Sequence, residues 1–238
     1  MKYIKKNKEP DSLKKYRCSA DPNKTYDNYS DNGELRKSLL EEQGYICCYC
    51  MKRIPDKNGR FKIEHWKPQS PCPDLQLEYK NLLASCFGGE GGPKHMQHCD
   101  THKADQKITI NPTDPNCESL VKFERKKAKD KKTDNKSESD PNYKRVAKCI
   151  HSLSGEITSD NQTIKDDLNE ILNLNLQTIV ENRRYALDKF LELFVKKHPS
   201  GTWNRTLIER VIKKWSSPLN NRYEEYCQIV VYYLRTKL

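Results

Sequence analysis

The spacing of apolar residues separates a sparse N-terminal half from a helical C-terminal third. Residues 1–32 are polar and rich in Asp, Asn and Lys, so they bury too little apolar surface to fold alone. We expect them to form an extended arm that lies on the rest of the protein. Three leucines at helical spacing, followed by Gly44 as a stop, predict one short helix over residues 33–42.

The C-terminal third has the period of amphipathic helices. From residue 163 onward, apolar residues recur every three or four positions, which places them on one face of a helix. Asn173 and Asn175 are expected to separate two helices, and the His-Pro-Ser-Gly run at 198–201 ends the second one. Two more amphipathic segments follow. The pattern predicts a bundle of three or four helices.

Between these parts the pattern predicts only short elements. Residues 45–110 contain few apolar residues and many Gly, Pro and Asn, so their structure needs support beyond hydrophobic burial, and a structural metal is the natural candidate. Alternating residues then predict strands over 118–125 and 147–157, with a turn at residues 154–155. The segment 126–144 is almost wholly charged and polar, and we interpret it as an insertion.

The net charge of the chain indicates the kind of partner it binds, and its hydropathy indicates its location in the cell. The chain has 44 Lys and Arg against 33 Asp and Glu, a net charge of +11, which favours nucleic acid as the partner. No apolar run reaches the roughly 18 residues that span a bilayer, and the first residues lack the apolar segment of a signal peptide. We therefore expect a cytoplasmic protein with no membrane partner. In a reducing compartment, ten cysteines favour metal binding over disulfides.

Four cysteines have the spacing of a structural zinc site. Cys47 and Cys50 form a Cys-x-x-Cys pair, which brings two sulfurs onto one tetrahedral ion, although alone it could be a redox pair. Cys86 and Cys99 flank a glycine-rich stretch that can loop out and return. Four thiolates leave no open position, so this Zn²⁺ would be structural. Another nearby ligand could replace one of the four: Cys48, His95 or His98.

The residues between and after these cysteines carry an acid-base pair and further polar groups. Glu64 and His65 stand side by side in Ile-Glu-His-Trp, Asn81 opens Asn-Leu-Leu, and His102 lies in Cys-Asp-Thr-His-Lys at 99–103. In this order the motifs resemble the HNH endonuclease motif with its ββα-metal fold. Hydrolysis of a phosphodiester needs a deprotonated water and a cation that neutralises charge on the phosphate.

The resemblance implies a role for each of these residues. His65 would be the general base, and Asn81 would orient its ring through the amide or the backbone. Glu64 would bind the catalytic metal, Mg²⁺ or Mn²⁺, with His102 as the second ligand. Lys103 and Lys67 would contact phosphate. Because neighbouring residues on a strand point to opposite faces, Glu64 and His65 can serve both functions only where the strand bends or ends.

A wider set of motifs resembles the HNH nuclease subunit of Septu and retron anti-phage systems (PtuB-like). It includes Gly-Tyr-Ile-Cys-Cys-Tyr-Cys at 44–50, Ile-Asn-Pro-Thr-Asp-Pro at 110–115 and Ile-Leu-Asn-Leu-Asn at 171–175. The similarity covers nearly the whole chain and departs from the family at the charged insertion. It implies a partner ATPase subunit (PtuA-like) and, in retron systems, a reverse transcriptase with its small DNA (msDNA).

Together these features predict an α+β protein with mostly helical N-terminal and C-terminal parts. The expected parts are an N-terminal arm and helix (1–43), an HNH ββα-metal core with structural zinc (44–112), a β-hairpin (113–160) and a helical domain that docks the partner (161–238). The expected function is metal-dependent cleavage of DNA in a defence complex. RNA such as transfer RNA stays open as the substrate, because the chemistry does not need the 2′-hydroxyl. A zinc-stabilised nucleic-acid-binding module without catalysis is the rival hypothesis.

Overall fold

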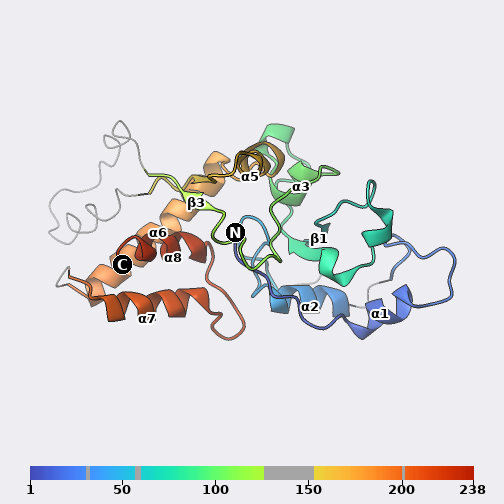
Figure 1. The fold of residues 1–238 in the computed structure, drawn as a ribbon, viewed down its shortest axis with the longest axis horizontal. Helices are drawn as coiled ribbons and strands as arrows, with labels where there is room; N and C mark the ends of the chain where they lie inside the picture. The colour runs from blue at the N-terminus through green and yellow to red at the C-terminus, as the bar shows by residue number, and fades with distance from the viewer. Residues whose placement is uncertain (31–32, 57–59, 126–152, 200–201) are drawn as a thin grey trace.

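The structure is a computed structural model, and it describes residues 1–30, 33–56, 60–125, 153–199 and 202–238. It combines helices with two small antiparallel sheets, which confirms the predicted α+β class. The C-terminal helices lie at one end of the molecule and the first helix lies toward the other end (Figure 1). The insertion expected at 126–144 lies outside the described residues.

The N-terminal arm lies along the rest of the chain. The amide of Ile4 donates to the carbonyl of Pro112 at 2.8 Å, which ties the start of the chain to a distant loop. Two helices follow in the N-terminal part, α1 (Asp11–Arg17) and α2 (Glu34–Glu42). The three leucines of α2 are buried, as expected for the apolar face of an amphipathic helix. The helix predicted at 33–42 is therefore confirmed to within one residue.

The central part consists of very short elements. Strand β1 (Lys62–His65) pairs antiparallel with β2 (Leu82–Ser85), so that the last residue of β1 faces the first residue of β2. The chain between the strands forms two 3₁₀ turns, η1 (Pro73–Leu75) and η2 (Tyr79–Asn81). A third turn, η3 (Lys94–Met96), precedes the five-residue helix α3 (Cys99–Lys103). Elements this short need stabilisation from outside themselves.

Among the described residues the second sheet has two residues in each strand, and residues 147–152 of the second expected strand lie outside these residues. Strand β3 (Lys122–Phe123) pairs with β4 (Ile157–Thr158), within or beside the two segments expected as longer strands. The turn expected at residues 154–155 is wrong. The amide of Ser154 donates to the carbonyl of Glu124, so the pairing with the β3 side extends to the residues just before β4. Gly155 has φ +92°, and a Cβ there would lie 2.4 Å from the carbonyl oxygen of Val180. This glycine serves a close approach to a helix, and the chain does not reverse there.

The C-terminal part is helical, as its periodicity predicts. It consists of α5 (Gln162–Asp166), a π-helical turn η5 (Asp167–Ile171), α6 (Gln177–Lys197), α7 (Arg205–Ser216) and α8 (Cys227–Arg235). The break predicted at Asn173 is present, and this residue has φ +46°. Helix α8 is buried along most of its length. None of the helices in the described ranges is long and apolar enough to cross a membrane.

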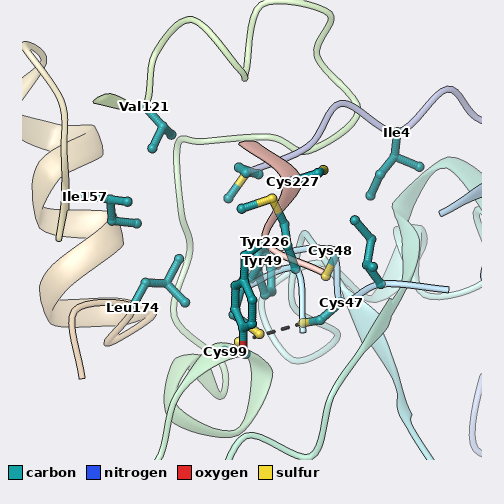
Figure 2. Close-up of a cluster of buried hydrophobic side chains, with 14 of the residues drawn as sticks. Ile4, Cys47, Cys48, Tyr49, Cys99, Val121, Ile157, Leu174, Tyr226 and Cys227 are labelled. Atoms are coloured by element: carbon teal, nitrogen blue, oxygen red, sulfur yellow. Dashed lines mark hydrogen bonds between the residues drawn. The ribbon is translucent and has the colours of Figure 1, made fainter. Parts of the chain in front are cut away.

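Buried side chains from all parts of the chain meet around the cysteines. Figure 2 shows Ile4 of the arm, Cys48 of the cysteine loop and Cys227 of α8 in one cluster. Leu174, from the segment before α6, lies in the same cluster. The short central elements therefore pack on the arm and on the C-terminal helices, which supply the apolar contacts that they lack.

Candidate functional site

The structure brings together the four cysteines with zinc-site spacing. The Sγ atoms of Cys47, Cys50, Cys86 and Cys99 all lie within 4.8 Å of one another. The Sγ atoms of Cys47 and Cys99 are 3.8 Å apart, and those of Cys50 and Cys86 are 3.7 Å apart. A regular tetrahedron of sulfurs at the Zn–S distance of about 2.3 Å has edges of about 3.8 Å. The cluster therefore has the size of a four-thiolate zinc site.

Hydrogen-bond donors around the sulfurs fit thiolate ligands. The amide of Cys86 donates to the Sγ of Cys47 at 3.4 Å, and the Nδ1 of His98 lies 3.1 Å from the Sγ of Cys99. Burial alone would raise the pKa of Cys47, but hydrogen bonds from the neighbouring thiols hold its pKa well below the usual value. The other cysteines differ, because hydrogen bonds with Cys47 and Cys50 raise the pKa of Cys86 and burial raises that of Cys99. Negative charge is therefore favoured on Cys47, and the four sulfurs could hold an ion such as Zn²⁺.

Chain geometry explains how two distant cysteine pairs converge. Gly88 has φ +54°, and a Cβ there would lie 2.0 Å from the carbonyl oxygen of His98. The amide of His98 in turn donates to the carbonyl of Gly88 at 2.9 Å. Only glycine fits this close approach. It closes the glycine-rich loop and sets Cys86 beside Cys99.

A buried arginine lies in the electric field of the cysteine cluster. Arg183 of α6 is 1% exposed, donates to the carbonyl of Gly155 at 3.3 Å, and leaves its Nε without a partner among the described residues. Burial lowers the pKa of Arg183 to about 10, and negative charge on Cys50 and Cys99 opposes this shift. A zinc ion with four thiolates carries a net charge of −2, so this buried cation fits a metal-loaded cluster.

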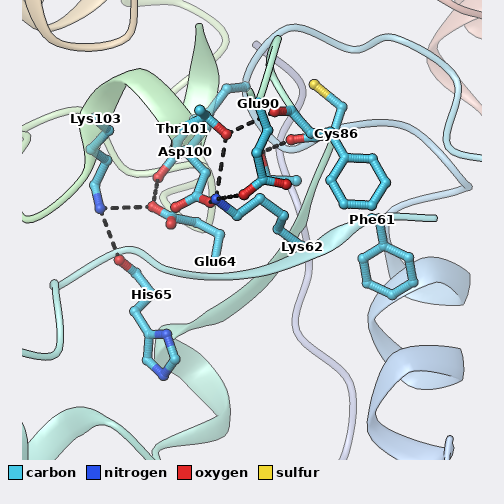
Figure 3. A network of polar contacts seen from close by, with 12 residues as sticks. Phe61, Lys62, Glu64, His65, Cys86, Glu90, Asp100, Thr101 and Lys103 are labelled. Atoms are coloured by element: carbon cyan, nitrogen blue, oxygen red, sulfur yellow. Dashed lines mark hydrogen bonds and ion pairs between the residues drawn. The ribbon is translucent and has the colours of Figure 1, made fainter. Parts of the chain in front are cut away.

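A second polar cluster joins β1 to α3. Glu64 is 2% exposed, accepts a hydrogen bond from the hydroxyl of Tyr49 at 2.6 Å, and forms an ion pair with Lys103 at 2.8 Å. Figure 3 shows Asp100 of α3 on the same side of β1 as Glu64. Burial and the neighbouring Asp100 carboxylate raise the pKa of Glu64, although Lys103 opposes this. The two carboxylates thus lie together, and their charge is balanced by the buried Lys103 and the partly buried Lys62.

His65 ends β1 and points the other way. Its Nε2 lies 2.9 Å from the carbonyl oxygen of Gln76, and the ring of Tyr26 packs edge-on against it at 4.5 Å. In Figure 3 the imidazole points away from the Glu64 carboxylate, as expected for neighbours on a strand. A carbonyl can only accept, so Nε2 carries the proton and Nδ1 keeps its lone pair. Burial lowers the pKa of His65, which favours the neutral ring.

Asn81 holds the backbone that follows His65. Its Oδ1 accepts from the amide of Lys67 at 2.7 Å, and its Nδ2 donates to the carbonyls of Lys67 and Leu75 at 2.9 and 3.1 Å. Its own carbonyl accepts from the amide of Trp66 at 3.0 Å. The amide does not contact the imidazole in these hydrogen bonds. Any orientation of the ring by Asn81 therefore acts through the backbone of this turn.

Helix α3 carries two candidate side chains, His102 and Lys103. The Nδ1 of His102 lies 2.9 Å from the carbonyl oxygen of Ile171, which leaves Nε2 as the nitrogen that could bind a metal. Within the described ranges, the four cysteines form the one group of three or more metal-binding side chains that converge. The expected phosphate contact of Lys103 is wrong, because this side chain is 1% exposed and paired with Glu64.

Comparison with known proteins gives three relatives and no matching family model. The first, named "Retron Ec83 putative HNH endonuclease" from Escherichia coli, is 26% identical over 219 residues, which cover 80% of both chains. "Septu protein PtuB" of Bacillus thuringiensis is 31% identical over 81 residues, which cover 33% of this chain and 28% of the relative. The chain is a homologue of these retron and Septu proteins. "Retron Vc95 putative HNH endonuclease" of Vibrio cholerae serotype O1 biovar El Tor is 33% identical over 88 residues, which cover 36% of this chain and 40% of the relative.

The sequence motifs assigned no role to three residues of this site. Tyr49 lies inside the Cys-x-x-Cys pair, Asp100 follows a cysteine, and Arg183 lies on an ordinary amphipathic helix. Tyr49 and Asp100 become notable through their interactions with Glu64, and Arg183 becomes notable through its burial and its electrostatic interaction with the cysteines. The spacing of Asp100 and Lys103, three positions apart on one short helix, is a local sign that both side chains lie on one face.

Proposed function

We propose that this chain is a metal-dependent HNH endonuclease that acts in an anti-phage defence complex. In this proposal β1, β2 and α3 form the ββα-metal core, and the four-cysteine cluster is its structural zinc site. The observation that carries the proposal is His65, held at the end of β1 with a lone pair on Nδ1. The names of the retron and Septu relatives support the nuclease activity and the defence setting.

His65 has the properties of a general base. The carbonyl of Gln76 fixes the tautomer, and a lowered pKa keeps the ring neutral and able to accept a proton. In the proposed reaction Nδ1 takes a proton from the water that attacks the phosphorus. Asn81 keeps the turn after β1 in place, so it acts as a positioning residue. Tyr26 restricts the ring from the arm side.

The carboxylates beside α3 supply oxygen ligands for a divalent ion. Glu64 and Asp100 lie together, and oxygen donors suit Mg²⁺ or Mn²⁺. When bound, such an ion would neutralise charge that builds on the phosphate. Glu64 is the proposed ligand from β1, Asp100 lies next to it, and His102 stays a predicted ligand through Nε2. Lys62, paired with Asp100 at 3.0 Å, is partly exposed and adds positive charge at this edge.

The chain's charge and the names of its relatives support the proposed substrate and partner. A net charge of +11 supports a nucleic-acid substrate, with DNA as the first choice and RNA, such as transfer RNA, as the second. The proposed partner is an ATPase subunit of the same defence system, with a reverse transcriptase and its small DNA in a retron setting. A complex of this kind would keep the nuclease inactive until infection.

The test compares DNA and RNA cleavage by the full chain, alone and with the ATPase, in Mg²⁺ and in Mn²⁺. His65→Ala should lower the cleavage rate by about 10² to 10⁴, the usual contribution of a general base. His95→Ala is the matched control, because His95 is an exposed histidine of the loop before α3. Zinc content and circular dichroism of both variants report whether the fold is intact.

The outcome separates the enzyme from a binding module. If His65→Ala keeps full cleavage while remaining folded, His65 is not the base. If neither polymer is cut by an intact complex in either metal, a zinc-stabilised nucleic-acid-binding module replaces the nuclease. Cleavage of RNA with DNA intact would change the substrate and leave the assignment of His65 in place.

A further inference from the structure

Helices α6 and α7 enclose a groove that the proposed nuclease chemistry does not use. Its volume is about 990 Å³, and it runs along α6 from Asn182 to His198 and along α7 from Leu207 to Trp215. At a rise of 1.5 Å per residue, the α6 side is roughly 24 Å long, which corresponds to a helix of about four turns. The groove therefore has the length of a helical segment.

The floor of the groove is apolar, and its aromatic rings are already packed. Phe190 stacks on Phe194 at 5.1 Å, and Trp215 lies edge-on to Phe190 at the same distance. The two phenylalanines are only 7% and 6% exposed. Leu193 and Tyr185 of α6 also line the groove and are 60% and 65% exposed, so they add accessible apolar surface to it. The surface therefore offers apolar area with few free ring faces for stacking bases.

The rim of the groove is mostly basic. Five cations line it: Lys52, Lys189, Lys197, Arg210 and Lys214. Within the described part of the chain, none of these side chains takes part in a salt bridge or a side-chain hydrogen bond. The remaining charges in the lining are the carboxylates of Glu224 and Glu225, and Glu225 already accepts from the amide of Arg53 at 2.6 Å. Net positive charge around an apolar floor favours an acidic, amphipathic occupant.

We propose that this groove binds an acidic amphipathic helix of a partner protein. The apolar face of that helix would cover Leu193 and the floor, and flanking Asp or Glu side chains would pair with the lysines of the rim. This proposal concerns protein docking and does not depend on nuclease activity. The segment 126–152 of the chain itself is an unsuitable occupant, because it contains more Lys and Arg than Asp and Glu. The packing of the floor's phenylalanine and tryptophan rings against one another disfavours single-stranded nucleic acid, whose bases need free ring faces to stack on.

The test titrates fluorescent peptides with the full chain and follows anisotropy at low ionic strength. One designed helical peptide has leucines at every third or fourth position and Glu on both flanks, and its partner peptide has Lys in place of Glu. The acidic peptide should bind at least about tenfold more tightly than the basic one. Leu193→Asp should weaken binding of the acidic peptide by a similar factor, because it removes exposed apolar area from the groove.

Charge reversal provides a matched control on the same two helices. Lys197→Glu with Lys214→Glu changes two rim residues, whereas Lys196→Glu with Lys213→Glu changes their exposed neighbours outside the groove. The first pair should weaken binding of the acidic peptide about tenfold or more, and the second pair should leave it within about twofold. Both double variants carry the same net charge, so a difference between them reports the position of the charges.

Three results would overturn the proposal. The first is equal binding of both peptides, or no binding of either. The second is tight binding of a labelled oligothymidine that the rim variant weakens and the neighbour variant does not, which would assign the groove to nucleic acid. The third is a concentration-dependent dimer, measured by light scattering, that Leu193→Asp dissociates, since this would assign the groove to a second copy of the chain. Cleavage of nucleic acid by the same preparations tests the nuclease separately.

Discussion

Replacement of Lys103 by Met tests whether the Glu64 cluster is built around a buried charge. Lys103 and Glu64 have side chains that are 1% and 2% exposed, and their ion pair measures 2.8 Å. The same Nζ donates to the carbonyl of His65 at 3.0 Å. Methionine keeps most of the volume of lysine and removes the charge and both contacts. Glu64 would then lie beside Asp100 with no buried cation against it.

The expected loss of stability is large. Removing one partner of a buried ion pair costs about 3–5 kcal/mol. Loss of the donor to His65 leaves a buried carbonyl with one partner fewer and adds about 1 kcal/mol. The sum is a large part of the 5–15 kcal/mol that stabilises a typical domain. A second change, Glu64→Gln, removes the unpaired charge, and the double variant should lose only about 2 kcal/mol.

Urea unfolding followed by circular dichroism measures these losses, with zinc in excess for every protein. Lys107→Met is the control, because Lys107 is an exposed lysine shortly after α3 and its replacement should change stability by less than about 0.5 kcal/mol. The reasoning fails if Lys103→Met is as stable as Lys107→Met. It also fails if adding Glu64→Gln makes the protein less stable than Lys103→Met alone, because the buried charge would then not be the cause.

Three further changes test the zinc cluster and the arm. Gly88→Ala should weaken zinc binding at least several-fold, since its Cβ would meet the carbonyl of His98, whereas Gly91→Ala, with no atom within 4 Å, should retain zinc in a chelator assay. Arg183→Met should lower the affinity for zinc about tenfold, measured by competition with a chromogenic chelator, because it removes the buried cation near the thiolates. An unchanged affinity would contradict this role. Burial would raise the pKa of Glu118, but its ion pair with Lys2 lowers this pKa below that of the unfolded chain. The carboxylate therefore stabilises the fold at a pH above the unfolded pKa, and this contribution is lost as the pH falls through the lower folded pKa. Glu118→Gln should therefore flatten the decline of unfolding free energy in acid, measured against wild type, and identical pH curves would refute the linkage.

Local sequence patterns predicted the helices well but could not predict contacts between distant segments. The leucine spacing located α2 to within one residue, and the three-to-four period predicted the C-terminal helices, because both signals lie within a single element. The strand expected over 118–125 is only two residues long, since alternation reports a possible strand and not its pairing partner. Gly155 was misassigned to a turn because a glycine is needed there for the backbone to pass close to α6, and no nearby residue in the sequence reveals that contact.

The candidate site shows the same limit. The zinc-site spacing of the cysteines and the Glu64-His65 pair are visible in the sequence, because these residue types are rarely placed together without a function. The partner of Glu64 was not visible. Lys103 has the sequence context of an exposed helix residue, and its burial depends on how α3 packs against β1. Charged residues on short elements are therefore the least predictable part of this site.

The four-cysteine cluster also sets an order for folding. Cys47 and Cys50 lie three residues apart and can capture a metal ion in the unfolded chain at small entropic cost. Cys99 lies 52 residues beyond Cys47, so its ligation closes a long loop that contains β1, β2 and the Glu64-His65 pair. We expect the hairpin and α3 to meet only once this loop has closed around a half-ligated ion. A nascent chain that lacks the metal would then contain Glu64, His65 and Lys103 without the contacts between β1 and α3.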